Sequence, residues 1–552
     1  MKGKTTLKTK RKLSLLELNH SFDGQVILPY SSGCVWSYCK GKVDYDLHHW
    51  FCELDQNLNI DETAEALSES DCIGVSYWVW NQRISDEICK KVKQYNPSCY
   101  IVYGGLSAHE GLLWQDHIDY VITNEGEKKF ASLLNGKPTN EVDRVDVTEM
   151  PSPYLDGTFD ILPDRKWEAL IEPIRGCPYS CTFCEIGENY YKKIYQNEKI
   201  FQEIDWISDR KIEFLHIADN NYGMLPWHNK LTDYIIEKHK MTGYPNSITN
   251  SWAKVKKPHL YKMAKKLEES GLSKGVTISI QSLHEPTLKA IKRTNGDIGE
   301  TINTLKKMKV KTHIELITGL PEETLDSFKD GVYTLLDEHN YQNCIDIYPL
   351  IALPNTPFGK EDYCEKWKIT KKPLAPIFTH HDLPKEELLK DTTDLAYSMS
   401  FEDYRELLIW RWFITSIHFL GWTRYIANNI PLTNREFYEK LYEYIDDQNT
   451  MLGKEKLIVR ELLGKFLNGE EIWGREMNGM YWEYEEVTAA EIWLNRIKFY
   501  NDIKEFCSDQ FHLDVSELCN TNLNMMKKPT DDLYKWVKEN FWWGRRKDAF
   551  YV

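Results

Sequence analysis

The chain has 552 residues and a mass of 65.1 kDa, which is too long for one hydrophobic core and predicts about three domains. Hydrophobic residues make up 42% and charged residues 28%, and no stretch approaches the ~18–20 apolar residues that a membrane helix requires. Residues 1–12 are basic and lack the apolar run of a secretion signal, so we expect a cytoplasmic protein. The formal charge of −15 disfavours duplex nucleic acid as a partner, because such partners require a basic surface.

The region 25–136 alternates short apolar runs with amphipathic segments and follows an expected tail at 1–24. Ile84, Ile88 and Val92 recur at i, i+4 and i+8, which predicts a helix between two of these runs. The expected strands are the apolar runs 26–28, 73–77, 100–103 and 120–122. This order predicts an α/β fold with a doubly wound, Rossmann-like parallel sheet, which binds ligands at the carboxyl ends of its strands.

Residues 137–166 are rich in turn-forming residues and are expected to form a linker. Between 167 and 358, apolar runs again alternate with charged amphipathic segments. The six expected strands are 167–174, 212–217, 246–251, 275–281, 311–318 and 344–350. Such βα units predict a partial (β/α)6 TIM-like barrel with its active site at the carboxyl ends of the strands. From 359 to 552 we expect a mainly α-helical C-terminal domain that caps the barrel and contacts the substrate.

Three of the 13 cysteines, Cys177, Cys181 and Cys184, stand close together directly after an expected strand. Thiolates are soft ligands that suit iron–sulfur clusters and zinc. Three of them can hold three irons of a [4Fe–4S] cluster and leave the fourth iron open to a small molecule. Structural zinc requires a fourth ligand nearby, and no cysteine or histidine follows before His216. A zinc site or a set of inert thiols is the alternative interpretation.

The run Arg175-Gly176-Cys177-Pro178-Tyr179-Ser180-Cys181-Thr182-Phe183-Cys184 resembles the signature of the radical S-adenosylmethionine (SAM) enzymes, and the resemblance covers roughly 167–358. It implies that the three cysteines hold a [4Fe–4S] cluster whose open iron binds the amino and carboxylate groups of SAM. An electron from the cluster then cleaves SAM to a 5′-deoxyadenosyl radical. An external one-electron donor such as flavodoxin or ferredoxin is implied as a partner.

Residues at later strand ends resemble the SAM-binding motifs of that family. The implied cofactor contacts are Phe183 beside the cluster, Asp219, Asn220 and Asn221 toward the amino group, Ser279 and Gln281 toward the ribose, Arg293 toward the carboxylate, Glu315 near the adenosine, and Tyr348 near the adenine. Strand alternation predicts that Ser279 and Gln281 point the same way. A helix cap at Asp219 and a surface ion pair at Arg293 are the alternatives.

The first region resembles the cobalamin-binding domain that precedes the barrel in one radical SAM subclass. The implied corrinoid contacts are Ser76, Tyr77, Trp78, Trp80, Asn81, Gly104, Gly105 and Glu125. The chain lacks the Asp-x-His-x-x-Gly sequence by which many cobalamin proteins supply a histidine as the lower ligand of cobalt. The resemblance therefore implies a base-off corrinoid without a histidine ligand, with Trp78 or Trp80 over its lower face. Ordinary turns at the glycines and core positions for the aromatic residues are the alternatives.

Together these resemblances imply a class B, cobalamin-dependent radical SAM methyltransferase that methylates an unactivated carbon by way of methylcobalamin. Two other functions stay open. One is a radical SAM enzyme that performs a cyclisation, rearrangement or oxidation, and the other is a non-catalytic iron–sulfur or zinc binding module. The sequence does not identify the substrate, and it leaves small molecules, lipids, saccharides and peptides open.

Overall fold

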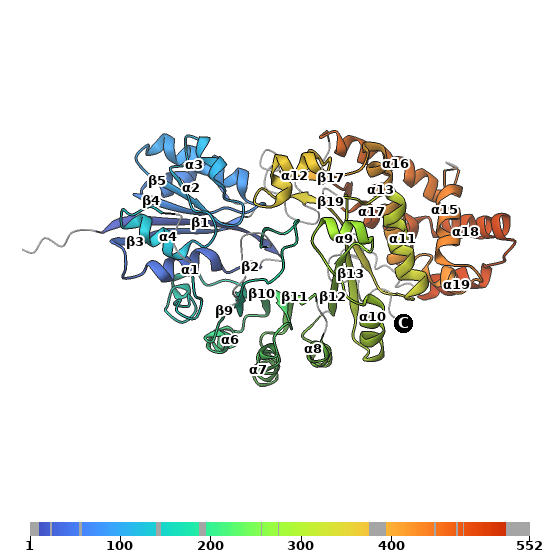
Figure 1. Ribbon diagram of the computed structural model, residues 1–552, viewed down its shortest axis with the longest axis horizontal. Helices are drawn as coiled ribbons and strands as arrows, with labels where there is room; N and C mark the ends of the chain where they lie inside the picture. Colours follow the sequence, from blue (N-terminus) through green and yellow to red (C-terminus); the bar gives the residue numbers. More distant parts are fainter. Residues whose placement is uncertain are drawn as a thin grey trace, which may run out of the picture.

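The computed structural model describes residues 10–22, 25–54, 58–139, 145–186, 195–254, 257–273, 275–374, 393–446, 449–470, 473–477 and 480–525. Figure 1 shows three consecutive parts, namely an α/β domain, a curved set of strands with helices on the outside, and a mainly helical region. Among the described residues, no helix is both long enough and apolar enough to cross a membrane.

Five parallel strands form the sheet of the first domain, in the order β3-β1-β4-β5-β6. They are β1 (Arg11–Phe22), β3 (Tyr45–Leu54), β4 (Cys72–Ser76), β5 (Tyr100–Gly104) and β6 (Tyr120–Val121). Counted within the domain, the order is 2-1-3-4-5, a common doubly wound arrangement whose strand order reverses between β1 and β4. A ligand site is expected beside that reversal, at the carboxyl ends of the strands.

Helices cover both faces of this sheet and make the domain doubly wound, as predicted. They are α1 (Tyr30–Cys39), α2 (Ile60–Ser68), α3 (Gln82–Tyr95) and α4 (Glu127–Leu134). Residues of α2 and α3, including the predicted stripe Ile84, Ile88 and Val92, share one apolar core with the sheet. Residues of α1 and α4 contribute to a second core.

The prediction of a tail over 1–24 is wrong for residues 11–22, because they form the central strand β1. Leu13, Leu15, Leu16 and Leu18 are at most 2% exposed. A strand that is buried on both faces shows no clear polar alternation, and the basic residues around it favoured a solvated tail. The edge strand β3 was also not predicted, since its pattern of buried and exposed residues is irregular.

The second part contains six parallel strands in two three-stranded groups, β11-β10-β7 and β12-β13-β14. They are β7 (Trp167–Ile171), β10 (Phe214–Tyr222), β11 (Ser247–Trp252), β12 (Val276–Gln281), β13 (Thr312–Thr318) and β14 (Ile345–Pro349). A parallel bridge between Ile248 and Ser273 connects the two groups beside β11 and β12. The helices are α6 (Ile200–Asp209), α7 (Trp227–Thr242), α8 (Pro258–Ser270), α9 (Glu285–Ala290), α10 (Ile298–Lys307) and α11 (Leu325–Tyr333). The predicted partial barrel is confirmed.

One short strand joins the first two parts into a continuous sheet. β2 (Gln25–Ile27) pairs antiparallel with the end of β1 and parallel with β7. The strand order therefore runs from β11 through β7, β2 and β1 to β6 without a break. Backbone hydrogen bonds thus hold the α/β domain against the first barrel strand.

The C-terminal region is mainly helical, as predicted, with two small antiparallel sheets added. The helices are α12 (Glu361–Lys366), α13 (Phe401–Ile414), α14 (Arg424–Asn428), α15 (Asn434–Tyr444), α16 (Met451–Leu467), α17 (Tyr484–Leu494), α18 (Arg496–Phe511) and α19 (Ser516–Met525). The strands are β15 (Ile351–Ala352), β16 (Thr370–Leu374) and β17 (Thr393–Tyr397) in one sheet, and β18 (Arg475–Met477) and β19 (Met480–Trp482) in the other. Short turns of helix also occur along the whole chain. They are η1 (Glu110–Trp114), η2 (Phe159–Ile161), η3 (Thr334–Glu338), η4 (Pro357–Gly359) and η6 (Thr415–Phe419).

This helical region shares one apolar core with the barrel. Trp410 packs edge-on against Phe328 and Tyr333 of α11. Trp410, Trp412 and Trp422 are at most 1% exposed. These tryptophans are therefore packing residues, and their abundance says nothing about the substrate.

Candidate functional site

The three cysteines lie in the loop that follows β8 (Ile174–Arg175), a short strand paired with β9 (Tyr195–Gln196). Cys177 and Cys181 are 8% and 3% exposed, and Cys184 is half-buried. Thiolates that share one loop can serve together as ligands of one iron–sulfur cluster.

Three hydrogen-bond donors from other segments face two of these sulfur atoms: two lie at strand ends, and the third, Arg293, lies between α9 and α10. Asn221 Nδ2 lies 3.1 Å from Cys177 Sγ, and Lys254 Nζ lies 3.0 Å from Cys181 Sγ. The Arg293 guanidinium lies 3.8 Å from Cys181 Sγ. Donors and positive charge near a thiol favour the thiolate, which is the form that binds a metal. The donor set therefore fits an anionic iron–sulfur cluster.

Arg293 is a buried cation without a carboxylate partner among the described residues. It is 6% exposed, and its guanidinium donates to the Ser279 carbonyl and, at 3.2 Å, to Asn295 Oδ1. Burial lowers the pKa of Arg293, because removal from water disfavours its charge. The alternative of a surface ion pair is wrong. A buried cation in this state favours an anionic ligand.

Lys254 was not among the sequence candidates, although it belongs to the same site. It follows β11 by two residues and lines one pocket with Ser279, Arg293 and Asn295. Its ammonium also lies 5.0 Å from the centre of the Tyr179 ring, between the first two cysteines. The position of Lys254 just after a strand was its only sequence signal.

The end of β10 carries the predicted polar group. Asp219 is 3% exposed, and its Oδ1 accepts a hydrogen bond of 2.8 Å from the backbone N–H of Asn221. Its Oδ2 lies 3.0 Å from His228 Nε2. The alternative of a helix cap is wrong, because α7 begins later, after Pro226. Asn220 is exposed, while its two neighbours are buried. The structure thus brings Asp219 and Asn221 to the cysteine loop and leaves Asn220 outside.

Ser279 and Glu315 lie side by side on β12 and β13, and the Ser279 hydroxyl donates to Glu315 Oε2 at 2.5 Å. The register between these strands shifts between Ser279 and Gln281, and Gln281 has a φ of +67°. The prediction that Ser279 and Gln281 point the same way is therefore wrong, since a bulge interrupts the alternation. Gln281 is 8% exposed, and its Oε1 has no hydrogen-bond partner within the part of the chain that the structure describes.

The remaining barrel candidates lie near the same end of the strands. Phe183 packs beside the apolar cluster formed by Leu288, Ile291 and Phe358, and its ring centre is 5.9 Å from the Arg293 guanidinium carbon. Tyr348 is 38% exposed on β14, so a ligand can reach its ring. Tyr363 of α12 donates a hydrogen bond of 3.1 Å to Thr182. The C-terminal region therefore contacts the cysteine loop directly.

The carboxyl end of β4 carries two stacked indoles in the first domain. The ring centres of Trp78 and Trp80 are 5.0 Å apart with an interplanar angle of 7°, and both residues are half-buried. Asn81 is wholly buried and donates to the carbonyls of Leu18 and Ser76, at 3.1 and 3.0 Å. Its side chain therefore holds the loop in shape, while the indoles present a flat surface at the strand end.

Other first-domain candidates have structural partners. Tyr77 is 3% exposed and its hydroxyl donates to Asp86 at 3.1 Å, so its ring belongs to the core. Gly105 has a φ of +112°, and a Cβ there would lie 2.7 Å from the Tyr77 carbonyl oxygen. This glycine therefore permits close approach of two chain segments. Gly104 has room for a side chain, and Glu125 accepts a hydrogen bond from the Val145 amide. Ser76 Oγ accepts a hydrogen bond of 2.8 Å from Trp78 Nε1.

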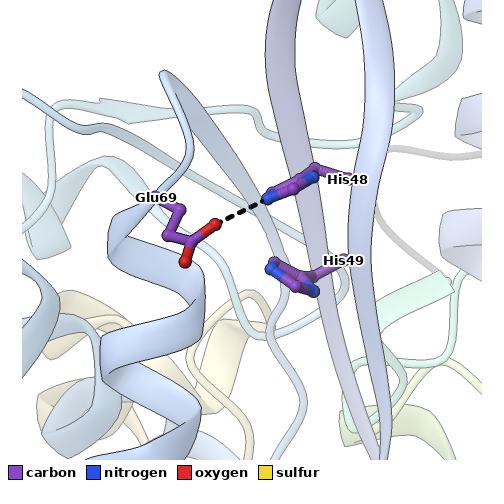
Figure 2. A group of neighbouring side chains, drawn as sticks. All are labelled: His48, His49 and Glu69. Carbon is purple, nitrogen blue, oxygen red and sulfur yellow. Dashed lines mark hydrogen bonds and ion pairs between the residues drawn. The ribbon is translucent and has the colours of Figure 1, made fainter.

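A second group of metal-binding residue types lies on the first domain. Figure 2 shows His48 and His49 on β3 facing Glu69 beyond the end of α2. The register between β1 and β3 shifts at His48, which brings the adjacent imidazoles to one side. The Lys12 ammonium lies 3.3 Å from His48 Nε2 and 3.6 Å from Glu69 Oε2. The Lys12 ammonium thus already neutralises the Glu69 carboxylate, and this exposed group is an ion-pair cluster.

Comparison with known proteins agrees with the geometry of the barrel. Residues 171–332 match the Radical SAM superfamily. The chain is 27% identical over 498 residues to 2-(S-pantetheinyl)-carbapenam-3-carboxylate methyltransferase of Streptantibioticus cattleyicolor, covering 81% of this chain and 72% of that protein. It is also 27% identical over 466 residues to the cobalamin-dependent radical SAM methyltransferase TokK of Streptomyces tokunonensis, covering 74% and 66%.

Solved structures share the fold over most of the chain. The cobalamin-dependent S-adenosylmethionine radical enzyme OxsB matches with a TM-score of 0.56 at 15% identity, covering 93% of this chain and 83% of OxsB. The radical SAM methyltransferase TsrM of Kitasatospora setae matches with a TM-score of 0.50 at 14% identity, covering 70% and 84%. Residues 171–332 therefore form a radical SAM region. Over most of its length, the chain is similar to a cobalamin-dependent radical SAM methyltransferase.

Proposed function

We propose that the protein is a cobalamin-dependent methyltransferase that forms a 5′-deoxyadenosyl radical and methylates an unactivated carbon of its substrate. The observation that carries the proposal is the continuous sheet, in which a doubly wound domain adjoins a barrel with a three-cysteine loop at its strand ends. When bound, the cluster and SAM supply radical chemistry and the corrinoid carries the methyl group. The protein chiefly binds, orients and shields these groups from water.

In this proposal Cys177, Cys181 and Cys184 hold the [4Fe–4S] cluster. Arg293 and Lys254 provide the positive charge that an anionic cluster and the SAM carboxylate require, and neither is paired with a carboxylate among the described residues. Asp219, oriented by the Asn221 amide and faced by His228, is suited to accept hydrogen bonds from the SAM amino group. Ser279 and Glu315 offer neighbouring hydroxyl and carboxylate groups to the ribose, with Phe183 and Tyr348 alongside.

The corrinoid would lie at the carboxyl ends of β4 and β5 in the first domain. Trp78 and Trp80 offer it a flat apolar surface in place of a histidine ligand, which supports a base-off state. Gly104 leaves room for close approach, and Gln281, Glu125 and Ser76 remain candidate contacts around the two cofactors. Asn81 and Tyr77 act by shaping the loop and the core beneath it.

The proposed division of the chain is a cobalamin-binding domain to 136, a linker over 137–166, the radical SAM barrel over 167–358 and a substrate-contacting region from 359. With β1 included, the first domain begins near residue 11 instead of 25. An external one-electron donor such as flavodoxin or ferredoxin would reduce the cluster. The substrate is a small molecule, lipid, saccharide or peptide.

The test is anaerobic reconstitution with iron, sulfide and hydroxocobalamin, followed by metal analysis and absorption spectroscopy. We expect about four irons and one corrinoid per chain, with iron lost in a variant in which all three loop cysteines are alanine. Cys344 is a matched control, because it is buried in the barrel away from the loop. A full cluster without corrinoid would contradict the methyltransferase and favour another radical SAM reaction. Failure of the wild type to bind SAM would favour a non-catalytic metal-binding module.

A further inference from the structure

A buried ion-pair network lies where the first domain meets the cysteine loop. Arg175 donates from one nitrogen to Glu127 Oε1 at 2.9 Å and from another to Glu172 Oε2 at 2.7 Å. Its Nε also donates to both oxygens of Glu172, at 3.0 and 3.1 Å. The exposed fractions of the side chains are 11% for Arg175, 6% for Glu127 and 20% for Glu172.

The three residues come from segments that border both proposed cofactor sites. Glu127 is the first residue of α4 and directly follows the loop after β6 in the first domain. Arg175 ends β8 and stands two residues before Cys177, while Glu172 lies between β7 and β8. One guanidinium therefore connects the carboxyl-end loop of one domain with the base of the cysteine loop of the other.

Such a network is better suited to setting geometry than to adding stability. Buried ion pairs lose much of their Coulomb energy to desolvation, so apolar packing would hold the domains together at least as well. The guanidinium is planar and its donors point in fixed directions, so two carboxylates on it are held at a defined separation and angle. Another ion pair near this junction, Arg165 with Glu53, is more exposed, at 23% and 29%, and its glutamate lies at the end of the edge strand β3.

We infer that Glu127, Arg175 and Glu172 are positioning residues that fix the cysteine loop against the carboxyl-end loops of the first domain. This inference rests on the proposed function, in which the three residues set the separation of the iron–sulfur cluster and the corrinoid. They touch neither the reacting atoms nor the substrate. They narrow the distribution of distances between the two cofactors.

The test uses the reconstituted holoenzyme and the variants Glu127→Gln and Arg175→Lys, which preserve approximate shape. Glu53→Gln is the matched control, because it breaks a carboxylate–arginine pair near the junction but away from the cysteine loop. The first measurement is the magnetic interaction between the reduced cluster and cob(II)alamin, both of which are paramagnetic. The second is amide hydrogen exchange over residues 174–186, with thermal melting to verify folding.

We expect the wild type and Glu53→Gln to show one narrow distribution of cluster–cobalt interactions. Glu127→Gln and Arg175→Lys should broaden it and accelerate exchange in the cysteine loop roughly tenfold, with iron and corrinoid content unchanged. Wild-type values for both measurements in both variants would overturn the inference, as would an equal effect of Glu53→Gln. If the wild type binds no corrinoid, the proposed function fails by itself, and the exchange measurement still decides whether the network orders the loop.

Discussion

Replacing Lys254 by methionine should lower the reduction potential of the iron–sulfur cluster. The ammonium lies 3.0 Å from Cys181 Sγ. For an order-of-magnitude estimate, the charge of a cluster bound by that sulfur is taken to be about 5.5 Å from the ammonium. At an effective dielectric constant of about 20, one unit charge at that distance contributes about 3 kcal/mol. For one electron, about 1.4 kcal/mol corresponds to 59 mV, so the upper bound on the change in reduction potential is about 130 mV. Solvent screening reduces the expected shift to roughly 60–130 mV.

The assay is a redox titration of the reconstituted protein, followed by the electron paramagnetic resonance signal of the reduced cluster. Lys257→Met is the matched control, because it removes the same charge from an exposed residue that begins the turn into α8. Lys254→Arg should restore most of the potential, since it keeps the charge. A potential within about 20 mV of the wild type in Lys254→Met would refute the reasoning and place the ammonium away from the loaded cluster.

Three further predictions concern the first domain and one buried carboxyl group. Trp78→Ala and Trp80→Ala should each weaken corrinoid binding, measured by spectroscopic titration, and unchanged affinity would remove that residue from the site. Gly105→Ala should lower the free energy of unfolding by about 1–3 kcal/mol in a denaturant titration, because φ is +112° and the Cβ would meet the Tyr77 carbonyl; wild-type stability would contradict this. Burial raises the pKa of Glu323 to about 8, so the folded chain keeps a proton that an unfolded glutamate releases near pH 4.3. Stability due to this group therefore falls as the pH rises from about 4.3 to about 8, so Glu323→Gln should raise the melting temperature by more at pH 8.5 than at pH 4.5; the same difference at both values would contradict the assignment.

Much of the fold could be predicted because local pattern and tertiary environment agree in its central elements. The stripe of Ile84, Ile88 and Val92 forms the buried face of α3, and the six apolar runs of the barrel became strands with bounds close to those expected. Where a strand is buried on both faces or contains a bulge, the hydrophobic pattern gave a wrong prediction. β1 is buried on both faces and was taken as part of a tail, and the bulge in β12 breaks the alternation between Ser279 and Gln281.

The candidate site also contains residues that the sequence could predict and residues that it could not. The three cysteines could be found because their spacing lies within one loop, and a metal-binding loop leaves a local trace in the sequence. Lys254 and His228 could not, since single residues acquire a role only when a strand end brings them beside Cys181 or Asp219. Asn81 was expected at a ligand, but only the hydrogen bonds to Leu18 and Ser76 show that it shapes the loop.

The sequence by itself determined the class of chemistry, because cysteine spacing and strand periodicity are properties of neighbouring residues. Only the tertiary structure decided how the two halves form one unit, since β2 pairs with β1 and β7 through backbone groups that carry no side-chain pattern. It also decided which charges face the cysteines and which are neutralised elsewhere. Charge acts through space, so Arg293 and Arg175, both buried arginines, differ in role because one lacks a carboxylate partner among the described residues and the other has two.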